Sequence, residues 1–495
     1  MSEKDFDLVK TKTGLYELTA DVSASPLAND DIAPTKVAQR TWSTYNIAAL
    51  WIGMSVCIPT YMLAAGLVAG GMSAWQAVFT VMLGNVIVLI PMILNAVPGT
   101  KFGIPFPVLV RASFGTLGSN IPALLRAGVA CGWFGIQTWI GGSALNAMML
   151  ALFSGWPVDG IGKWIAFFVF WAINVWIIIK GMDFLKKFES WAAPILIVMG
   201  IAMLIWAMGE AGGIGPIMSE PSKFATFGDF WKFFIPGLTG MVGFWATLSL
   251  NIPDFSRFAR DQKAQIYGQL LGLPTTMTLY AFLGVAITSA TVIIFGEALW
   301  DPVAVLGRFT NPAVIVVGMF WLAVATLSTN IAANVVSPAN DFQNLWPKKI
   351  NFAIGGVITA IIGIAIRPWW LLSDYGNYIF GWLGTYAGLL GPVAGIMIVD
   401  YFIIRKGMLN VRDLYLRGGE YEYTGGFNWK AIAAFAIGAG VTLIGKWVDA
   451  VSWLADYSWF IGFAIGFVLY YVLMRGTKVA DLSLVPEQGA VAEAE

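Results

Sequence analysis

The stretch ALWIGMSVCIPTY, residues Ala49–Tyr61, places a glycine and a proline inside one long apolar run. Pro59 cannot donate a backbone hydrogen bond and frees a carbonyl about one turn earlier, near Ser55. Gly53 lies on the other side of that point. Backbone polar groups cannot stay unpaired in lipid, so a break at this depth has to face a cavity lined by protein. The stretch therefore predicts a membrane helix that is interrupted near its middle.

A second interruption is predicted at Pro236–Trp245, which reads PGLTGMVGFW. This run comes five membrane spans after the first. Interrupted helices at matching positions of two halves indicate a transporter whose site lies between inverted repeats. The alternative is that the glycines only let helices pack closely. The matching positions favour the transporter.

Composition extends this picture to the whole chain. Of the 495 residues, 58% are hydrophobic and only 12% are charged, about half the usual charged share. Because a membrane span needs about 20 mostly apolar residues, the sequence predicts an all-α polytopic membrane protein. Its twelve candidate transmembrane spans, numbered one to twelve below, are 45–70, 73–97, 119–153, 161–181, 190–209, 230–252, 269–296, 311–336, 351–366, 375–401, 430–447 and 452–474.

Lysine and arginine set the expected orientation, since they gather on the cytoplasmic side. With the N-terminus inside, 22 of the 29 basic residues fall in inside segments and 6 fall outside. We therefore expect both termini to be cytoplasmic. The expected division is a polar N-terminal tail (1–44), a first five-helix repeat (45–209), an extracellular loop (210–229), a second repeat (230–406), a cytoplasmic loop (407–429), two peripheral helices (430–474) and a C-terminal tail (475–495).

Several function classes are excluded or disfavoured. The net charge is zero and no basic stripe exists, so nucleic-acid binding is not expected. The two cysteines, Cys57 and Cys131, cannot make a disulfide scaffold. The chain has no histidine, which removes the usual zinc sites, Ser-His-Asp catalysis and histidine proton relays. A polytopic membrane enzyme is therefore disfavoured, and no cofactor is expected.

Polar residues deep in spans three and eight indicate where a ligand and an ion bind. Trp133 and Gln137 are four residues apart and share a helix face. An indole beside an amide suits a flat, hydrogen-bonding ring, although a packed tryptophan and a helix-packing glutamine would look the same. Ala325, Ser328 and Thr329 also share one face, and their oxygens suit a small hard cation. The alternative is that the hydroxyls bond back to their own helix.

Charged residues are scarce in the spans. Arg126 is the one that we expect at depth, with Asp254 and Asp400 at cytoplasmic ends. Proton-coupled carriers commonly use a titratable group inside the membrane. Neutral oxygen ligands therefore favour sodium as the coupling ion, and Asp254 is the residue to test if the ion is a proton.

Six motifs are specific enough to indicate a family. They are Lys101–Pro107 (KFGIPFP), Arg111–Gly115 (RASFG), Trp133–Thr138 (WFGIQT), Asn251–Phe258 (NIPDFSRF), Ala332–Ala339 (AANVVSPA) and Gly391–Gly395 (GPVAG). With them, nearly the whole chain resembles the nucleobase–cation symporter family of the first type. This family includes cytosine, uracil, allantoin and hydantoin permeases.

The resemblance implies the leucine-transporter fold, with two inverted five-helix repeats and two peripheral helices. It also implies a site in which Trp133 and Trp245 stack on a heterocycle while Gln137 and Asn334 bind its N–H and C=O groups. The sodium site would consist of the carbonyls of Gly53, Val56 and Ala325 and the hydroxyls of Ser328 and Thr329.

One position departs from the pattern. Cys57 stands where relatives often have Asn or Gln, and a thiol is a weak hydrogen-bond partner. The identity of the substrate therefore stays open within the family.

The resulting expectation is a monomeric secondary-active symporter in a bacterial inner membrane, importing a uracil, allantoin or hydantoin type of ring with sodium. A proton-coupled cytosine or purine permease of the same family is the alternative. A channel is disfavoured, because a channel needs no pair of stacking tryptophans around a polar cleft.

Overall fold

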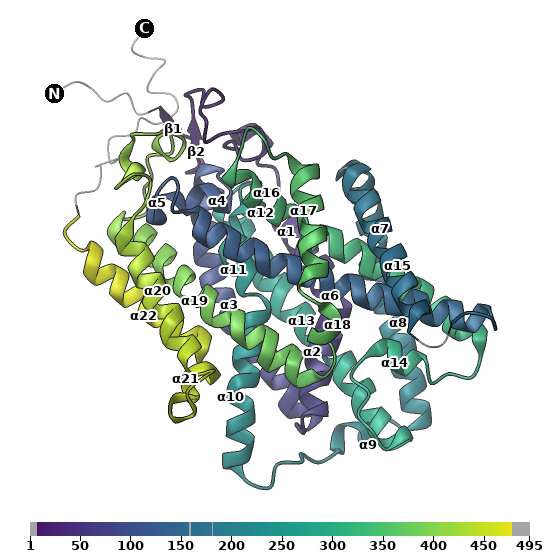
Figure 1. Cartoon of the computed structure of the whole chain (residues 1–495). Helices are drawn as coiled ribbons and strands as arrows, with labels where there is room; N and C mark the ends of the chain where they lie inside the picture. Colours follow the sequence, from purple (N-terminus) through teal and green to yellow (C-terminus); the bar gives the residue numbers. More distant parts are fainter. Residues whose placement is uncertain (1–6, 158–159, 181, 478–495) are drawn as a thin grey trace, which may run out of the picture.

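The computed structural model describes residues 7–157, 160–180 and 182–477, and it is almost entirely helical (Figure 1). One antiparallel pair of short strands, β1 (Leu8–Lys10) and β2 (Tyr16–Leu18), precedes the helices. The first half contains η1 (Val37–Gln39), α1 (Thr44–Ser55), α2 (Ile58–Ala69), α3 (Ala74–Phe102), α4 (Phe106–Leu109), α5 (Arg111–Phe114), α6 (Asn120–Leu152), α7 (Ile161–Lys180), α8 (Met182–Glu210), α9 (Ile214–Ser219), α10 (Phe227–Phe244), α11 (Ala246–Asn251) and α12 (Pro253–Ser256).

The second half contains α13 (Gln262–Phe295), α14 (Pro302–Leu306), α15 (Pro312–Asn334), α16 (Val336–Leu345), α17 (Phe352–Ala365), α18 (Pro368–Leu371), η2 (Asn377–Leu383), α19 (Gly384–Val399), η3 (Asp400–Ile404), η4 (Asp413–Tyr415), η5 (Glu420–Glu422), α20 (Trp429–Ile444), η6 (Asp449–Val451), α21 (Trp453–Asp456) and α22 (Ser458–Met474). In space, α13 packs against α1, α2 and α3, α6 packs against α15, α16 and α17, and α19 packs against α22.

Every expected span overlaps at least one helix. Five helices of the described residues are long and apolar enough to cross a membrane, and the bent pair α1–α2 makes a sixth. Shorter apolar helices are Pro194–Glu210, Phe352–Ala365, Trp429–Ile444 and Ser458–Met474. The prediction of an all-helical membrane protein is therefore confirmed, while the number twelve stays a prediction.

The interruption of span one is present. Helix α1 ends at Ser55, α2 begins at Ile58, and the two helices are bent by 58°. Cys57 is in an extended conformation (φ −145°, ψ 158°), and Pro59 lies in the first turn of α2, where a missing N–H costs nothing.

The interruption of span six lies at the last residue of the predicted stretch. Helix α10 continues through Pro236 and the glycines to Phe244, and the break is at Trp245. A Cβ atom on Gly240 would lie 2.9 Å from Ile379 Cγ2. These glycines therefore serve close packing, which is the alternative that the sequence left open, and only the residue after them breaks the helix.

Span eight extends beyond its predicted end at residue 336. Helix α15 leads through Val335 into α16, and Pro312–Leu345 together form one candidate span. Asp341 is thereby brought to the interior, with 0% of its side chain exposed. The expectation that Arg126 is the one charged residue at depth is wrong, because α16 adds a carboxylate.

The β1–β2 hairpin lies at the same end of the bundle as α4, α5, α12 and α16 (Figure 1), and we call this end the hairpin face. Two buried arginines join the N-terminal segment to it. Arg40 of this segment donates to the Lys101 carbonyl of α3 at 3.3 Å, and Arg111 of α5 donates to the Leu27 carbonyl at 3.0 Å. Burial lowers the pKa of each guanidinium to about 10, so both stay charged at neutral pH.

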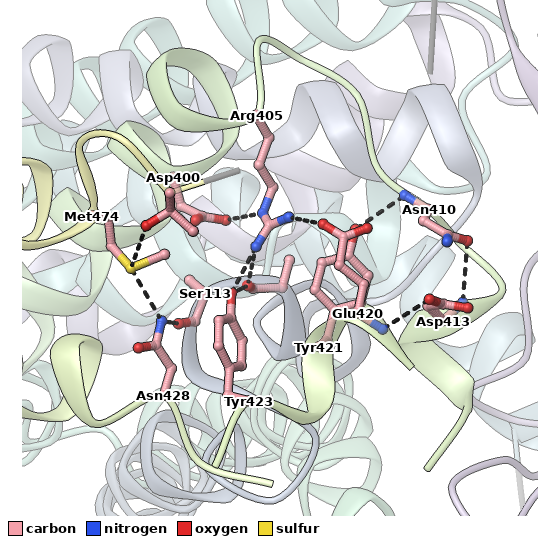
Figure 2. Close-up of polar contacts among 12 residues, drawn as sticks. Ser113, Asp400, Arg405, Asn410, Asp413, Glu420, Tyr421, Tyr423, Asn428 and Met474 are labelled. Carbon is pink, nitrogen blue, oxygen red and sulfur yellow. Dashed lines mark hydrogen bonds and ion pairs between the residues drawn. The ribbon is translucent and has the colours of Figure 1, made fainter. Parts of the chain in front are cut away.

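A third buried arginine, Arg405, ties η3 to the loop that follows it (Figure 2). Its guanidinium donates to Asp400 Oδ2 at 2.8 Å, Glu420 Oε1 at 2.7 Å, the Tyr423 hydroxyl at 2.7 Å and the Ala112 carbonyl at 2.8 Å. The other Asp400 oxygen accepts from the Tyr470 hydroxyl of α22 at 2.7 Å. Burial alone would lower the pKa of Arg405, but Asp400 together with Tyr421, Tyr423 and Tyr470 outweighs burial and holds that pKa well above its usual value. This cluster fastens the peripheral helices to the core.

Candidate functional site

Both helix breaks open onto one small cavity. It is lined by Met54, Cys57, Pro59, Arg126, Ala130, Trp133, Gln137, Phe244, Trp245, Thr247, Leu248, Ala333 and Asn334. The structure thus brings together all five predicted substrate residues, from the α1–α2 break, α6, the α10–α11 break and the end of α15. The cavity volume is about 30 Å³, which is room for a few water molecules at most. A pyrimidine ring therefore does not fit until the side chains around the cavity move.

The two tryptophans do not form a pair of facing plates. Phe244 lies between them and meets both edge-on, with ring centroids 5.0 Å from Trp133 and 5.0 Å from Trp245. Trp133 also contacts Tyr378 of η2 edge-on at 6.0 Å. The sequence analysis missed Phe244, although its place directly before Trp245 in the broken run was a signal. A ring entering between the tryptophans has to displace Phe244.

Each predicted amide partner uses only one side of its carboxamide within the protein. Gln137 Oε1 accepts from the Thr329 hydroxyl at 2.9 Å, and Asn334 Nδ2 donates to Asn330 Oδ1 at 3.0 Å. Among the described residues, Gln137 Nε2 and Asn334 Oδ1 make no hydrogen bond, and the buried Trp245 Nε1 has no partner. One amide donor and one amide acceptor are therefore left for a ligand.

The predicted ion ligands on α15 divide into two kinds. The Thr329 hydroxyl lies 3.1 Å from the Ala325 carbonyl of its own helix, as the back-bonding alternative predicts. The Ser328 hydroxyl is buried and has no partner among the described residues. Gly53 and Val56 lie at the end of α1, which contacts α15. The candidate ligands are therefore backbone carbonyls, the unpaired Ser328 hydroxyl and the Thr329 oxygen. Such a set of oxygen ligands fits a hard monovalent cation.

A charged pair lies where the cavity approaches the hairpin face. Arg126 Nη1 is 3.4 Å from Asp341 Oδ2, and the two side chains are 1% and 0% exposed. Arg126 Nε and Asp341 Oδ1 are buried with no partner in the described part of the chain. Nearby, Asp254 accepts from the Phe106 N–H at 2.9 Å. The sequence analysis missed Asp341 because it placed this residue beyond the end of span eight.

Comparisons with known proteins agree with this architecture. A family model described as permease for cytosine/purines, uracil, thiamine and allantoin matches residues 34–462. The allantoin permease of Bacillus subtilis is 46% identical over 481 residues, which cover 95% of this chain and 98% of that protein. The purine-uracil permease NCS1 of Arabidopsis thaliana is 43% identical over 479 residues, covering 92% and 80%.

The fold also matches a solved transporter. Mhp1, a nucleobase-cation-symport-1 family transporter solved in a closed conformation with bromovinylhydantoin bound, superposes with a TM-score of 0.77 at 27% identity, covering 91% of this chain and 95% of Mhp1. The family resemblance drawn from the motifs is thus confirmed. The chain belongs to the nucleobase–cation symporter-1 family, and it is a membrane permease rather than an enzyme.

Proposed function

We propose that this permease imports a planar cyclic amide of the allantoin, hydantoin or uracil type together with sodium, by alternating access. The observation that carries the proposal is the convergence of Cys57, Trp133, Gln137, Trp245 and Asn334 on one cavity. The 46% identical relative is named an allantoin permease, which puts allantoin first among the substrates to test.

In this proposal the ring lies against the indoles of Trp133 and Trp245 after Phe244 has moved. Gln137 Nε2 donates to a ring carbonyl, and Asn334 Oδ1 accepts from a ring N–H, because neither atom is engaged within the protein. Stacking a base-like ring on an aromatic side chain contributes about 1–3 kcal/mol. The amides then decide the orientation of the ring.

Sodium coupling is supported by the Thr329 hydroxyl. It donates its one proton either to Gln137 Oε1 at 2.9 Å or to the Ala325 carbonyl at 3.1 Å, and in both cases its lone pairs are left for a cation beside the orphaned Ser328 hydroxyl. A cation held there fixes Thr329, and Thr329 fixes the Gln137 amide that faces the ring. By reciprocity, sodium raises substrate affinity by the same factor as substrate raises sodium affinity.

The membrane arrangement that we propose follows the expected division of the chain. It has twelve spans as two inverted five-helix repeats and two peripheral helices, with the loops and tails assigned above. The breaks at Cys57 and Trp245, five spans apart, support the two repeats. The distribution of basic residues supports cytoplasmic termini in a bacterial inner membrane. The transporting unit is a monomer, because one chain supplies the whole pocket.

The second candidate is a proton-coupled cytosine or purine permease of the same fold. It is favoured by one observation, the buried carboxylates of Asp254 and Asp341 near the cavity. In that case the coupling would survive the loss of the α15 hydroxyls.

The test is uptake of labelled allantoin, hydantoin, uracil and cytosine by cells that lack their own permeases, in sodium and in choline buffers. We expect saturable uptake of at least one of the first three that depends on sodium at fixed pH. Uptake that ignores sodium and collapses with the pH gradient would assign proton coupling.

The matched variants lie on one helix. Ser328→Ala combined with Thr329→Val should abolish the sodium dependence of substrate binding. Thr326→Val removes another buried orphan hydroxyl of α15 that is outside the predicted ligand set, so it should leave that dependence intact. If the two changes reduce the sodium dependence equally, the loss of any α15 hydroxyl is enough to abolish it, and the effect is not specific to Ser328 and Thr329.

A further inference from the structure

The residues that line the cavity extend further along α6 than the contacts proposed for the ring. Its lining on α6 runs from Gln137 through Trp133 and Ala130 to Arg126. At 1.5 Å per residue, the seven positions from Trp133 to Arg126 span about 10 Å along the helix axis. A ring bound at Trp133 and Gln137 therefore leaves the part of the cavity toward the hairpin face for something else.

That part of the cavity ends at an arginine with unused donors. A guanidinium has five N–H groups, and Arg126 makes one contact within the described residues, at 3.4 Å to Asp341. Its Nε is buried without a partner, and so is Asp341 Oδ1. Leaving such groups unpaired in the interior carries a desolvation cost, and a ligand that accepts from the guanidinium would relieve it.

We propose that Arg126 forms a second subsite, which binds a hydrogen-bond-accepting side group attached to the ring. The proposal rests on the proposed function, since the ring must first occupy the site at Trp133, Gln137 and Asn334. Allantoin fits this description, because it is a hydantoin ring that carries a ureido group with one carbonyl oxygen and several N–H donors. Uracil and unsubstituted hydantoin have no such group.

The charge of the subsite selects between acceptors. Asp341 lies beside Arg126 and is completely buried, so the guanidinium charge is already balanced. A carboxylate side group would add an uncompensated negative charge to a buried site, which is costly. A neutral ureido group can instead accept from Arg126 through its carbonyl without adding a charge. The subsite therefore favours a neutral, polar side group.

The neighbouring lining offers nothing equivalent. Ala130, Leu248 and Ala333 are apolar, and Thr247 is the one other polar side chain on this stretch of the described lining. Selectivity for the side group thus depends on Arg126. Losing a hydrogen bond to a charged group leaves that group unpaired and lowers the affinity about tenfold to hundredfold.

The first test uses the unchanged protein and a ligand series. Purified full-length permease in sodium buffer is titrated with allantoin, with hydantoin, and with a hydantoin that carries an alkyl group of the same length at the ring carbon that bears the ureido group. We expect allantoin to bind about tenfold or more tightly than the alkyl analogue. Equal binding of the two overturns the subsite while leaving ring recognition intact.

The second test removes Arg126 without leaving an unpaired carboxylate at Asp341. Arg126→Met with Asp341→Asn should weaken allantoin binding by about tenfold or more relative to hydantoin binding. Asp341→Asn alone should keep most of the preference for allantoin over hydantoin. A general loss, equal for both ligands, assigns Arg126 to structure and overturns the subsite. If the unchanged protein binds none of the rings, the proposed function fails as well, so the two failures are distinguishable.

Discussion

Two buried arginine–aspartate pairs of this permease differ in how completely they are satisfied. Arg405 directs its donors to Asp400, Glu420, Tyr423 and a carbonyl at 2.7–2.8 Å, and both Asp400 oxygens are engaged (Figure 2). Arg126 has one 3.4 Å contact with Asp341, and each partner keeps a buried atom without a hydrogen bond.

The difference separates structure from function. A fully paired buried ion cluster rigidifies the elements that it joins, here η3, the loop after it and α22. A partly paired buried cluster destabilises the fold without rigidifying it, unless another molecule completes its hydrogen bonds. Arg126 lines the cavity, whereas no residue of the Arg405 cluster does. The unpaired donor of Arg126 therefore supports a ligand contact at this end of the cavity.

The largest expected effect contrasts the stability of the two pairs. Arg405→Met with Asp400→Asn leaves Glu420 without its ion-pair partner and removes the Arg405 donors from Tyr423 and the Ala112 carbonyl, and should lower the free energy of unfolding by about 3–5 kcal/mol. Arg126→Met with Asp341→Asn leaves no other described group without its partner and should cost less than about 1 kcal/mol. Thermal unfolding of the purified proteins measures both.

An exposed arginine provides the reference for this contrast. Arg412 pairs with Asp7 at 2.7 Å and is 52% exposed, and Arg412→Met should change the stability by less than about 1 kcal/mol. If the Arg126 double variant unfolds as easily as the Arg405 double variant, both pairs are structural and the contrast fails.

The next effect concerns the aromatic walls of the cavity. Trp133→Ala or Trp245→Ala should weaken substrate binding by about 1–3 kcal/mol, since a stacked ring loses its platform. Gln137→Ala should cost less than either. Trp139 lies on the same helix but contacts Trp164 and Phe167 outside the cavity, so Trp139→Ala is the control. Equal, mild effects on substrate binding in all four variants would contradict stacking of the substrate ring between Trp133 and Trp245.

The smallest effect is a change in selectivity at the break of span one. Cys57 Sγ contacts the Thr60 hydroxyl at 3.3 Å and lines the cavity. Cys57→Asn supplies both a donor and an acceptor and should change the order of affinities among uracil, hydantoin and allantoin by a few-fold, roughly the worth of one hydrogen bond. Cys57→Ser keeps a small group beside Thr60 and should preserve the order. An unchanged order in the asparagine variant means that this position only packs against the break.

Much of the fold could be predicted from the sequence, because the length of an apolar run and the position of a proline in it determine local structure. The break after Ser55 and the spans themselves follow from such patterns. The exact break at Trp245 could not be predicted, since Gly240 and Gly243 turn out to meet Ile379 and Leu383, which are distant in the sequence.

The candidate site divides in the same way. Trp133 and Gln137 could be found because they are four residues apart on one helix. Phe244 could have been found from its place directly before Trp245, but Asp341 could not, since its role depends on which side chains of other helices it reaches. The convergence of Arg126 with Asp341 requires α6 and α16 to pack together, a contact between residues 215 positions apart.

The central claim, that the cavity between the two helix breaks binds the substrate, has a direct test in the two cysteines of the chain. Both are buried free thiols, and Cys57 lines the cavity whereas Cys131, on α6, does not. The rate at which a small thiol reagent modifies each cysteine is measured by mass spectrometry, with and without saturating allantoin or hydantoin in sodium buffer. We expect the substrate to slow modification of Cys57 and to leave the modification rate of Cys131 unchanged. A ligand that is transported but protects neither cysteine, or both equally, would contradict the central claim.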